Sequence, residues 1–182
     1  MIIAGVDEVG RGCLAGPVIA AAVILSHPIE DLKDSKLLSI KKRETLSKII
    51  KRDSVFTLAS VDNNEIDTIN IHQASLKAMQ EAIIKLPIAP DIVYVDGKFI
   101  PDVGVNCKAI IRGDKLIKEI SAASIIAKVH RDEFMKKLDK KFPVYGFAKN
   151  KGYGTKQHLN ALKDHGYTSF HRLSYKGVLT LT

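Results

Sequence analysis

The chain has 182 residues, 46% of them hydrophobic, which suits one globular domain, and its formal charge of +8 favours a polyanionic partner such as nucleic acid. Its two cysteines, Cys13 and Cys107, lack disulfide or metal-site spacing, which excludes a zinc site or a disulfide scaffold and favours a reducing, cytoplasmic location. No apolar run approaches the roughly 18 residues of a membrane helix and the N-terminus lacks a signal-peptide pattern, so we expect no membrane association.

Three strands and two helices are predicted in the first half of the chain. The apolar runs that predict strands lie at 2–6, 17–25 and 55–61. Helical spacing of apolar residues predicts helices over 35–51 and 66–86. Ser39 is the expected N-cap of the first helix, and Pro87 ends the second.

The second half alternates strands and helices. Strands are expected at 91–95 and 105–111, and helices at 119–138 and 155–165, with Gly166 just past the last one. The small residues "SAAS", 121–124, should let their helix pack closely on a sheet. This order predicts a mixed α/β sheet with helices on both faces and a site where strand ends meet.

Four acidic residues stand where apolar runs give way to glycine-containing loops. They are Asp7, Glu8, Asp96 and Asp114, and they follow the first, fourth and fifth predicted strands. Each alone would equally suit a solvated turn, because Asp–Gly pairs are common turn formers. If those strands are neighbours, however, the four carboxylates converge and need a cation to offset their repulsion.

Oxygen-only ligands of this kind favour Mg²⁺ or Mn²⁺ over zinc. Two such ions held by carboxylates serve phosphodiester hydrolysis, one activating water and the other stabilising the leaving oxygen. One geometric condition applies, because adjacent strand residues point to opposite faces. Asp7 and Glu8 can share a site only if their strand bends or ends there, which the following glycines would permit.

The turn after these acids is a candidate substrate contact. Gly10 and Gly12 leave backbone groups open to a ligand, and Arg11 between them can bind a phosphate through its forked guanidinium. Backbone groups can also sense a 2′-hydroxyl, which distinguishes RNA from DNA. The alternative is an ordinary hairpin turn with a surface arginine.

A second basic region lies at 136–156, with seven lysines, one acid and interleaved aromatic residues. Lysines with aromatics suit neutralisation of a nucleic-acid backbone together with stacking. Tyr153 lies between two glycines and is expected to be exposed, whereas Phe142 and Phe147 are expected in the core. Asp132 is spaced for helix ion pairs with Lys128 or Lys136, so we interpret it as structural.

Taken together, these motifs resemble type 2 ribonuclease H across nearly the whole chain. The matching segments are "GVDEVGRG", "LKDSKLLS", "YVDGK", "GDKLIKEISAASIIAKVHRD" and "YGFAKNKGYGT". The resemblance implies the ribonuclease H fold, a five-stranded mixed sheet flanked by helices, with a small C-terminal helical extension at roughly 143–182. It also implies metal-dependent cleavage of RNA in RNA–DNA hybrids, and incision 5′ to single ribonucleotides in duplex DNA, leaving 3′-hydroxyl and 5′-phosphate ends.

The resemblance also assigns roles to individual residues. Asp7, Glu8, Asp96 and Asp114 look like the metal-binding carboxylates, and Gly10, Arg11 and Gly12 look like the turn that contacts the ribonucleotide. Tyr153 looks like the tyrosine that contacts the 2′-hydroxyl and stacks on the neighbouring deoxyribose. Ser35 and Lys36 resemble a phosphate-contacting pair. A role in ribonucleotide removal during replication and repair is therefore expected, and a monomer is the default expectation because no exposed apolar helix stands out.

Two departures from the family pattern stand out. Cys13 replaces the usual proline after "GRG", and Leu37 replaces a lysine of the "DSK" segment. Neither affects a carboxylate, so an active enzyme is expected. Related type 3 enzymes usually carry lysine in the glycine turn, so Arg11 favours type 2.

Two alternatives stay open. A junction resolvase of the same fold would cleave branched DNA without needing a ribose. A non-catalytic nucleic-acid binder would need no cluster of carboxylates, so the acids at predicted strand ends argue against it.

Overall fold

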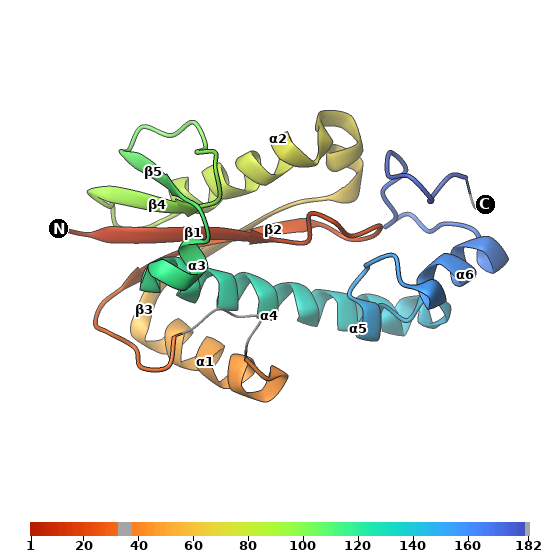
Figure 1. Cartoon of the computed structure of the whole chain (residues 1–182), viewed down its shortest axis with the longest axis horizontal. Coiled ribbons are helices and arrows are strands. Elements are labelled where there is room, and N and C mark those ends of the chain that lie inside the picture. The colour runs from red at the N-terminus through yellow and green to blue at the C-terminus, as the bar shows by residue number, and fades with distance from the viewer. Residues whose placement is uncertain (33–37, 181–182) are drawn as a thin grey trace.

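The computed structural model describes residues 1–32 and 38–180. Figure 1 shows the elements, which in chain order are β1 Ile3–Val9, β2 Val18–Leu25, α1 Ile40–Asp53, β3 Ser54–Val61, α2 Asn63–Ile84, β4 Ile92–Asp96, β5 Cys107–Ile110, α3 Gly113–Leu116, α4 Lys118–Lys141, the 3₁₀ turn η2 Pro143–Tyr145, α5 Phe147–Asn150 and α6 Lys156–His165. None of these helices is both long and apolar enough to cross a membrane, within the residues described.

The five strands form one mixed sheet in the order β3-β2-β1-β4-β5. β1 pairs antiparallel with β2 and parallel with β4, which itself pairs parallel with β5. This arrangement confirms the predicted mixed sheet and places the carboxyl ends of β1, β4 and β5 at the same edge.

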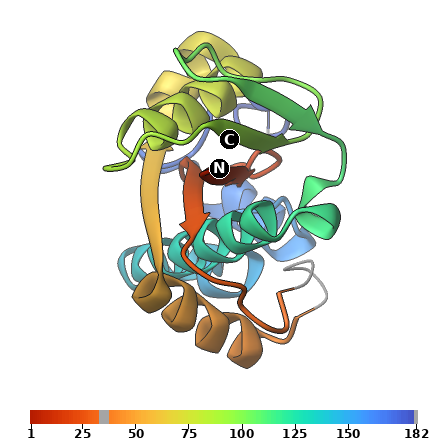
Figure 2. The same cartoon turned by 90° about the vertical axis from the view of Figure 1, so that its left-hand side faces the viewer.

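Helices cover both faces of the sheet, as Figure 2 shows in the end-on view. One hydrophobic core lies between the sheet and α2, with Val6, Val95 and Met79 among its buried members. A second core lies between the other face and α1 and α4, with Val23, Leu46 and Ile126. The sheet is thus shielded from water on both sides, which explains why its central strands are almost continuously apolar.

The close approach of α4 to β1 depends on small residues, as the sequence predicts. A Cβ added at Gly5 would lie 2.1 Å from the backbone carbon of Glu119, so only glycine fits there. On the helix, Ala122 and Ala123 are completely buried. This contact fixes the first half of α4 beside the end of β1, where the acidic residues lie.

Several boundaries differ from those predicted. The first strand continues to Val9 instead of ending before Asp7, and the loop predicted around Asp114 is the short helix α3. The helix α2 is interrupted at Asn70, whose φ is 66°, and the Asn70 side chain caps the following turn by accepting from the amides of His72 and Gln73. The N-cap role predicted for Ser39 is confirmed, because its Oγ accepts from the Lys42 amide.

The segment after α4 folds back against the end of that helix through a third core. Leu14, Met135, Tyr145, Phe147 and Leu162 are among its buried members. Phe147 is completely buried and Phe142 packs against the same core, as predicted. This core joins the C-terminal segment to the turn after β1, so two regions far apart in sequence share one side of the molecule.

Candidate active site

Asp7 and Glu8 lie where β1 loses one of its two neighbouring strands. The parallel pairing of β1 with β4 ends at Val6–Val95, whereas the antiparallel pairing with β2 continues to Val9–Ile19. Of the two ways in which these acids could share a site, a bend or an end of their strand, the second does not occur: β4 ends there, and β1 goes on. Because that edge of β1 is open beyond Val6, side chains from both faces reach the same space.

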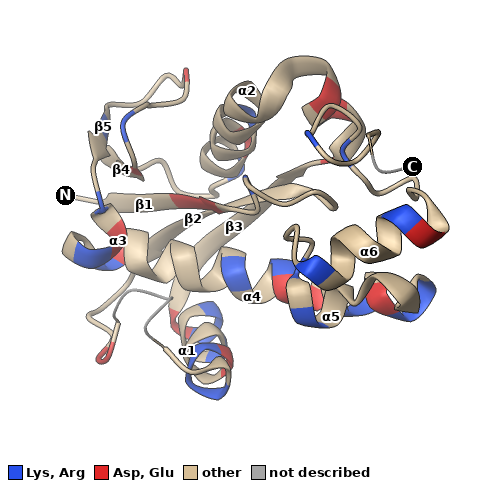
Figure 3. Ribbon diagram, turned by 45° about the vertical axis from the view of Figure 1, so that its right-hand side comes forward, with Lys and Arg blue, Asp and Glu red and all other residues tan. Residues whose placement is uncertain are grey.

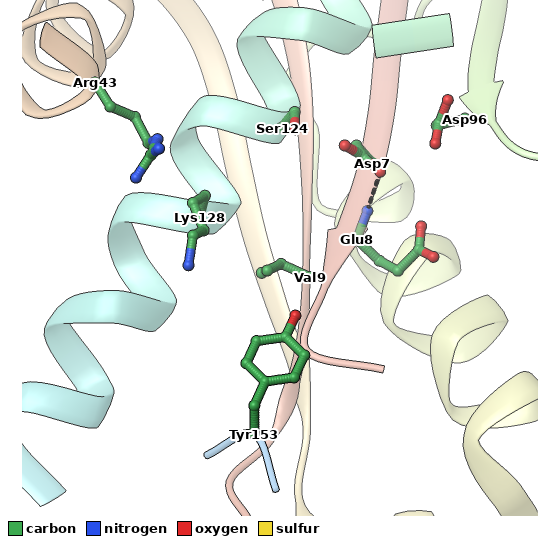
Figure 4. Close-up of a pocket in the computed structure, with 8 residues that line it drawn as sticks. All are labelled: Asp7, Glu8, Val9, Arg43, Asp96, Ser124, Lys128 and Tyr153. Carbon is green, nitrogen blue, oxygen red and sulfur yellow. Dashed lines mark hydrogen bonds between the residues drawn. The ribbon is translucent and has the colours of Figure 1, made fainter. Parts of the chain in front are cut away.

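A cavity of about 400 Å³ occupies this space. Figure 4 shows the residues that line it, which are Asp7, Glu8, Val9, Arg43, Asp96, Ser124, Lys128 and Tyr153. Three of the four predicted carboxylates therefore share one cavity with the predicted tyrosine. Two cations, Arg43 and Lys128, face it from α1 and α4.

The fourth predicted carboxylate, Asp114, is not among the residues that line the cavity. It is buried in the first turn of α3, whose preceding residue, Arg112, has a left-handed φ of 57°. The Oδ1 atom of Asp96 accepts hydrogen bonds from the amides of Gly113 at 2.7 Å and Asp114 at 3.4 Å. Asp96 thus connects the end of β4 to the first turn of α3, where Asp114 lies.

The carboxylates of β1 are electrostatically strained. Burial, followed by the charges of Glu8 and Asp96, raises the pKa of Asp7 well above its usual value, against hydrogen bonds from Ser124 and the Glu8 amide. Burial likewise raises the pKa of Glu8, although Arg11, at 3.4 Å, opposes the shift. Both side chains would gain from added positive charge in the cavity.

The donor set suits a hard cation. The Oε2 atom of Glu8 is buried and has no hydrogen-bond partner among the described residues. In residues 1–32 and 38–180, the side chains as they stand form no group of three or more His, Cys, Asp or Glu able to hold a metal ion. The fit of this site to Mg²⁺ or Mn²⁺ therefore rests on its oxygen-only chemistry and on the unsatisfied carboxylate oxygen.

The turn after β1 is held by a buried arginine from the C-terminal segment. Arg172, which is 0% exposed, donates to the carbonyls of Gly10 at 2.7 Å, Arg11 at 2.9 Å and Gly16 at 2.8 Å. The Tyr175 hydroxyl also donates to the Arg11 carbonyl, at 2.5 Å. The backbone of the turn is therefore fixed before any ligand arrives.

A second buried arginine connects the same turn to the Tyr153 loop. Arg131 of α4, also 0% exposed, donates to the carbonyls of Ala15, Pro17 and Lys151 at 3.0, 3.0 and 2.7 Å. Its side chain passes directly beneath Gly10, where an added Cβ would lie 2.3 Å from Nε. With φ at +96° as well, this position requires glycine.

Tyr153 stands against the turn at the mouth of the cavity. A Cβ at Gly12 would lie 3.8 Å from its Cε1 atom, and the tyrosine is 44% exposed, as predicted. The Gly152 carbonyl accepts from the Leu14 amide at 2.8 Å, which fastens the loop to the turn. Burial and the neighbouring Cys13 thiol raise the pKa of Tyr153, so its hydroxyl stays protonated at neutral pH.

The sequence profile of the family described as Ribonuclease HII matches residues 4–178. The chain belongs to the ribonuclease HII family. The Ribonuclease HII of Pelagibacter ubique (strain HTCC1062) is 51% identical over 183 residues, covering 99% of this chain and 98% of that protein. That of Coxiella burnetii (strain Dugway 5J108-111) is 54% identical over 184 residues, covering 100% of this chain and 91% of that protein.

Solved structures agree with this family assignment. The ribonuclease H2 from Pyrococcus horikoshii OT3 superposes with a TM-score of 0.86 at 26% identity, covering 100% of this chain and 97% of that one. Bst-RNase HIII in complex with Mn²⁺ shares the fold, with a TM-score of 0.76 at 17% identity, covering 100% of this chain and 69% of that one. This chain therefore has the ribonuclease H fold. It is an endoribonuclease, an enzyme that hydrolyses phosphodiester bonds.

Several residues of this ribonuclease HII site were missed by the sequence analysis. Ser124 and Lys128 are one helical turn apart on α4 and both face the cavity. We interpreted Ser124 only as a small packing residue and Lys128 only as an ion-pair partner. Their i, i+4 spacing on a helix expected to pack near the acids was the signal available.

The roles of the two buried arginines, Arg131 and Arg172, are harder to recognise in the sequence than those of Ser124 and Lys128. Arginine is rarely fully buried, and the two acids that follow Arg131, Asp132 and Glu133, suggest a solvated helix charge, whereas no acid stands beside Arg172. Most of their partners are backbone carbonyls more than a hundred residues away, which sequence spacing does not show. Arg43 is similar, since it was counted only as part of a predicted helix.

Two further assignments have different outcomes. The helix ion pair predicted for Asp132 with Lys128 is confirmed, with Oδ1 at 2.7 Å from the Lys128 Nζ. Ser35, Lys36 and the unusual Leu37 lie outside the residues that the structure describes.

Proposed function

We propose that this ribonuclease HII cleaves RNA in RNA–DNA hybrids and incises duplex DNA 5′ to single embedded ribonucleotides, leaving 3′-hydroxyl and 5′-phosphate ends. One observation carries this proposal: Asp7, Glu8 and Asp96 line the same cavity as Tyr153. A group able to cleave a phosphodiester and a group able to contact the adjacent sugar thus lie within reach of one nucleotide step. The corresponding role is removal of ribonucleotides from DNA during replication and repair.

We assign Asp7, Glu8, Asp96 and Asp114 to hold Mg²⁺ or Mn²⁺. The unsatisfied Oε2 of Glu8 and the raised pKa of Asp7 support this assignment, and the Mn²⁺ complex of Bst-RNase HIII shows that a protein of this fold binds such an ion. When bound, two ions would supply an activated water and stabilise the leaving 3′-oxygen. Ser124 donates a hydrogen bond to Asp7 and thereby orients its carboxylate.

The turn and the tyrosine are proposed to recognise the ribose. The carbonyls of Gly10 and Arg11 are already bonded to Arg172, which fixes the turn so that its exposed groups can meet a 2′-hydroxyl. Arg11 is half-exposed and can reach a phosphate, while the Tyr153 ring can stack on the deoxyribose that follows the ribonucleotide. A step from RNA to DNA would satisfy both contacts at once.

The remaining duplex would lie along a basic surface. Figure 3 shows Lys and Arg on α1, α4, α5 and α6, in contrast to the acidic end of β1. We propose that residues 143–182 act as a substrate-binding extension, and that a monomer suffices for the reaction. Lys128 and Arg43 would meet the phosphates nearest the carboxylates. Ser35 and Lys36 stay a predicted phosphate-contacting pair.

The test uses end-labelled DNA duplexes with one embedded ribonucleotide, incubated with Mg²⁺, Mn²⁺ or a chelator. An all-DNA duplex, a long RNA–DNA hybrid and a four-way DNA junction serve as comparisons. We expect metal-dependent incision 5′ to the ribonucleotide and an intact all-DNA duplex. Cleavage of the junction without incision at the ribonucleotide would overturn the substrate assignment and favour a resolvase.

A further inference from the structure

Two histidines of the C-terminal segment form a buried pair behind the Tyr153 loop. His158 in α6 is 0% exposed and His171 is 1% exposed, and their Nε2 atoms lie 3.0 Å apart. The rings of Tyr145 and Phe147 enclose the pair, with centroids 5.1 to 6.1 Å from the imidazoles. The Tyr145 hydroxyl donates away from the pair, to the Gly166 carbonyl at 2.7 Å.

The outer nitrogens of the pair fix where its protons lie. The Nδ1 atom of His158 is 2.9 Å from the Tyr153 carbonyl, which can only accept, so this nitrogen carries a proton. The Nδ1 atom of His171 accepts from the Thr168 amide at 2.9 Å, so this nitrogen carries none. In neutral rings, His171 then holds its proton on Nε2 and donates it to the bare Nε2 of His158.

The result is one chain of hydrogen bonds with a single direction. It starts at the Thr168 amide, passes through His171 and His158, and ends at the Tyr153 carbonyl. A proton added to either ring would place two N–H groups against each other or leave one facing a donor. The pair therefore works only when both imidazoles are neutral, in opposite tautomers.

The end of this chain completes the fixation of the tyrosine loop. The Lys151 carbonyl is held by Arg131 and the Gly152 carbonyl by the Leu14 amide. The Tyr153 carbonyl also accepts from the Thr155 amide at 2.8 Å, which closes the tight turn into α6. His158 is thus the side chain that links the Tyr153 backbone to the rest of the C-terminal segment.

We propose that His158 and His171 are positioning residues, which set the Tyr153 ring beside Gly12 through the Tyr153 carbonyl and so control incision at single ribonucleotides. The inference rests on the proposed function, because it gives Tyr153 the task of recognising the RNA-to-DNA step. Neither histidine lines the cavity. Their effect passes through the loop backbone alone.

The first test observes the tautomers in the intact protein. NMR of the ¹⁵N-labelled imidazoles at neutral pH should show His158 protonated on Nδ1 and His171 on Nε2, with scalar coupling between the two Nε2 nuclei. Two identical tautomers, or an imidazolium at either position, would overturn the proposal. Substrate is absent from this measurement, so it does not depend on the proposed function.

The second test compares ring and donor replacements of His158. In His158→Phe the ring volume remains but the donor to Tyr153 is lost, whereas the amide of His158→Asn can replace that donor. We expect His158→Phe to lower kcat/KM about tenfold on a duplex with one ribonucleotide, and far less on a long hybrid. His158→Asn should recover most of the loss, and His27→Phe, at an exposed histidine outside the proposed substrate-binding extension, should match the wild type.

A double-mutant cycle with Tyr153→Ala separates positioning from general damage. If His158 acts through Tyr153, His158→Phe adds little to the loss already caused by Tyr153→Ala. Additive losses, or equal losses on both substrates, would overturn the proposal. If Tyr153→Ala itself changes neither substrate, the proposed recognition role fails. The backbone amide shifts of Gly152 and Tyr153 then decide the positioning claim, which is overturned if His158→Phe leaves them unchanged.

Discussion

At the end of β1, Asp7 is buried and Glu8 is partly buried in the same cavity as Asp96, and one buried oxygen of Glu8 has no hydrogen-bond partner among the described residues. A few residues further along, the opposite holds. The carbonyls of Gly10, Arg11 and Gly16 each accept from Arg172. The carboxylates on one side of the cavity thus lack compensating positive charge. On the other side, the backbone carbonyls of the turn are already hydrogen-bonded within the protein.

This difference suits two different tasks. Buried like charges destabilise a folded protein until a cation joins them, so the carboxylate side gains free energy by binding one. A turn whose backbone is already hydrogen-bonded loses little conformational entropy when a ligand binds, and it does not adjust its shape to fit the wrong sugar. We therefore expect phosphodiester cleavage to depend on the carboxylates, and selectivity for the ribonucleotide to depend on the hydrogen-bonded turn, called the satisfied side below.

The largest expected effect on the difference between the carboxylates and the turn comes from replacing Asp7. In Asp7→Asn, one buried charge is removed without a change of shape, so turnover should fall by about a thousandfold or more, or roughly 4 kcal/mol of transition-state stabilisation. Nucleic-acid binding should persist, because the basic surface is untouched. In chelator, the variant should unfold at the same or a higher temperature than the wild type. Unchanged turnover would refute the site assignment.

On the satisfied side, Arg172→Ala should damage stability first. Three carbonyls would lose their buried donor, which should cost at least about 3 kcal/mol of unfolding free energy. Urea unfolding followed by circular dichroism measures this. The matched control is Arg52→Ala, at an exposed ion pair with Asp53, which should leave the midpoint nearly unchanged. Equal midpoints for the two variants would show that the turn does not depend on Arg172.

The histidine pair makes the satisfied side sensitive to acid. Burial lowers the pKa of His171 to about 4 from an ordinary 6.5. Between those values the unfolded chain binds the proton and the folded chain does not, so stability is full above pH 6.5 and falls as the pH drops towards 4. The loss should reach roughly 2–3 kcal/mol. Stability of His171→Asn should vary less over this range, and parallel curves for variant and wild type would contradict the prediction.

At Tyr153 the expected effect is smaller and concerns selectivity. Tyr153→Ala should lower incision at single embedded ribonucleotides about tenfold more than cleavage of long hybrids. The reason is that only the former substrate places a deoxyribose directly after the ribonucleotide. Paired kcat/KM measurements on the two substrates check this, with Ile84→Ala, at an exposed position outside the proposed substrate-binding extension, as the control. Equal losses would count against junction recognition.

Much of the fold was predictable because its signals are local. Continuous apolar runs identified the strands, and Ser39 and Gly166 marked helix ends that the structure confirms. The exact end of β1 was not predictable, since the strand continues to Val9 through its pairing with β2 after its pairing with β4 has ended. The interruption of α2 at Asn70 is a similar case, because an asparagine inside a helical pattern has several allowed conformations.

The same distinction applies to the site. Asp7, Glu8 and Asp96 stood out because each acid follows an apolar run. Arg131 and Arg172 did not, because most of their partners are distant backbone carbonyls, and the histidine pair did not, because only the fold brings the two rings together. Residues that bear the proposed chemistry have a recognisable context in sequence, whereas the residues that hold them in place become visible only once the chain is folded.

The most direct measurement of this difference is thermal unfolding in a series of Mn²⁺ concentrations, for the wild type and Asp7→Asn. We expect Mn²⁺ to raise the wild-type midpoint progressively, because an ion bound only by the folded state stabilises it by mass action. The midpoint of Asp7→Asn should respond much less. An equal response of both proteins would contradict the placement of the metal at these carboxylates, as would the absence of any response in the wild type.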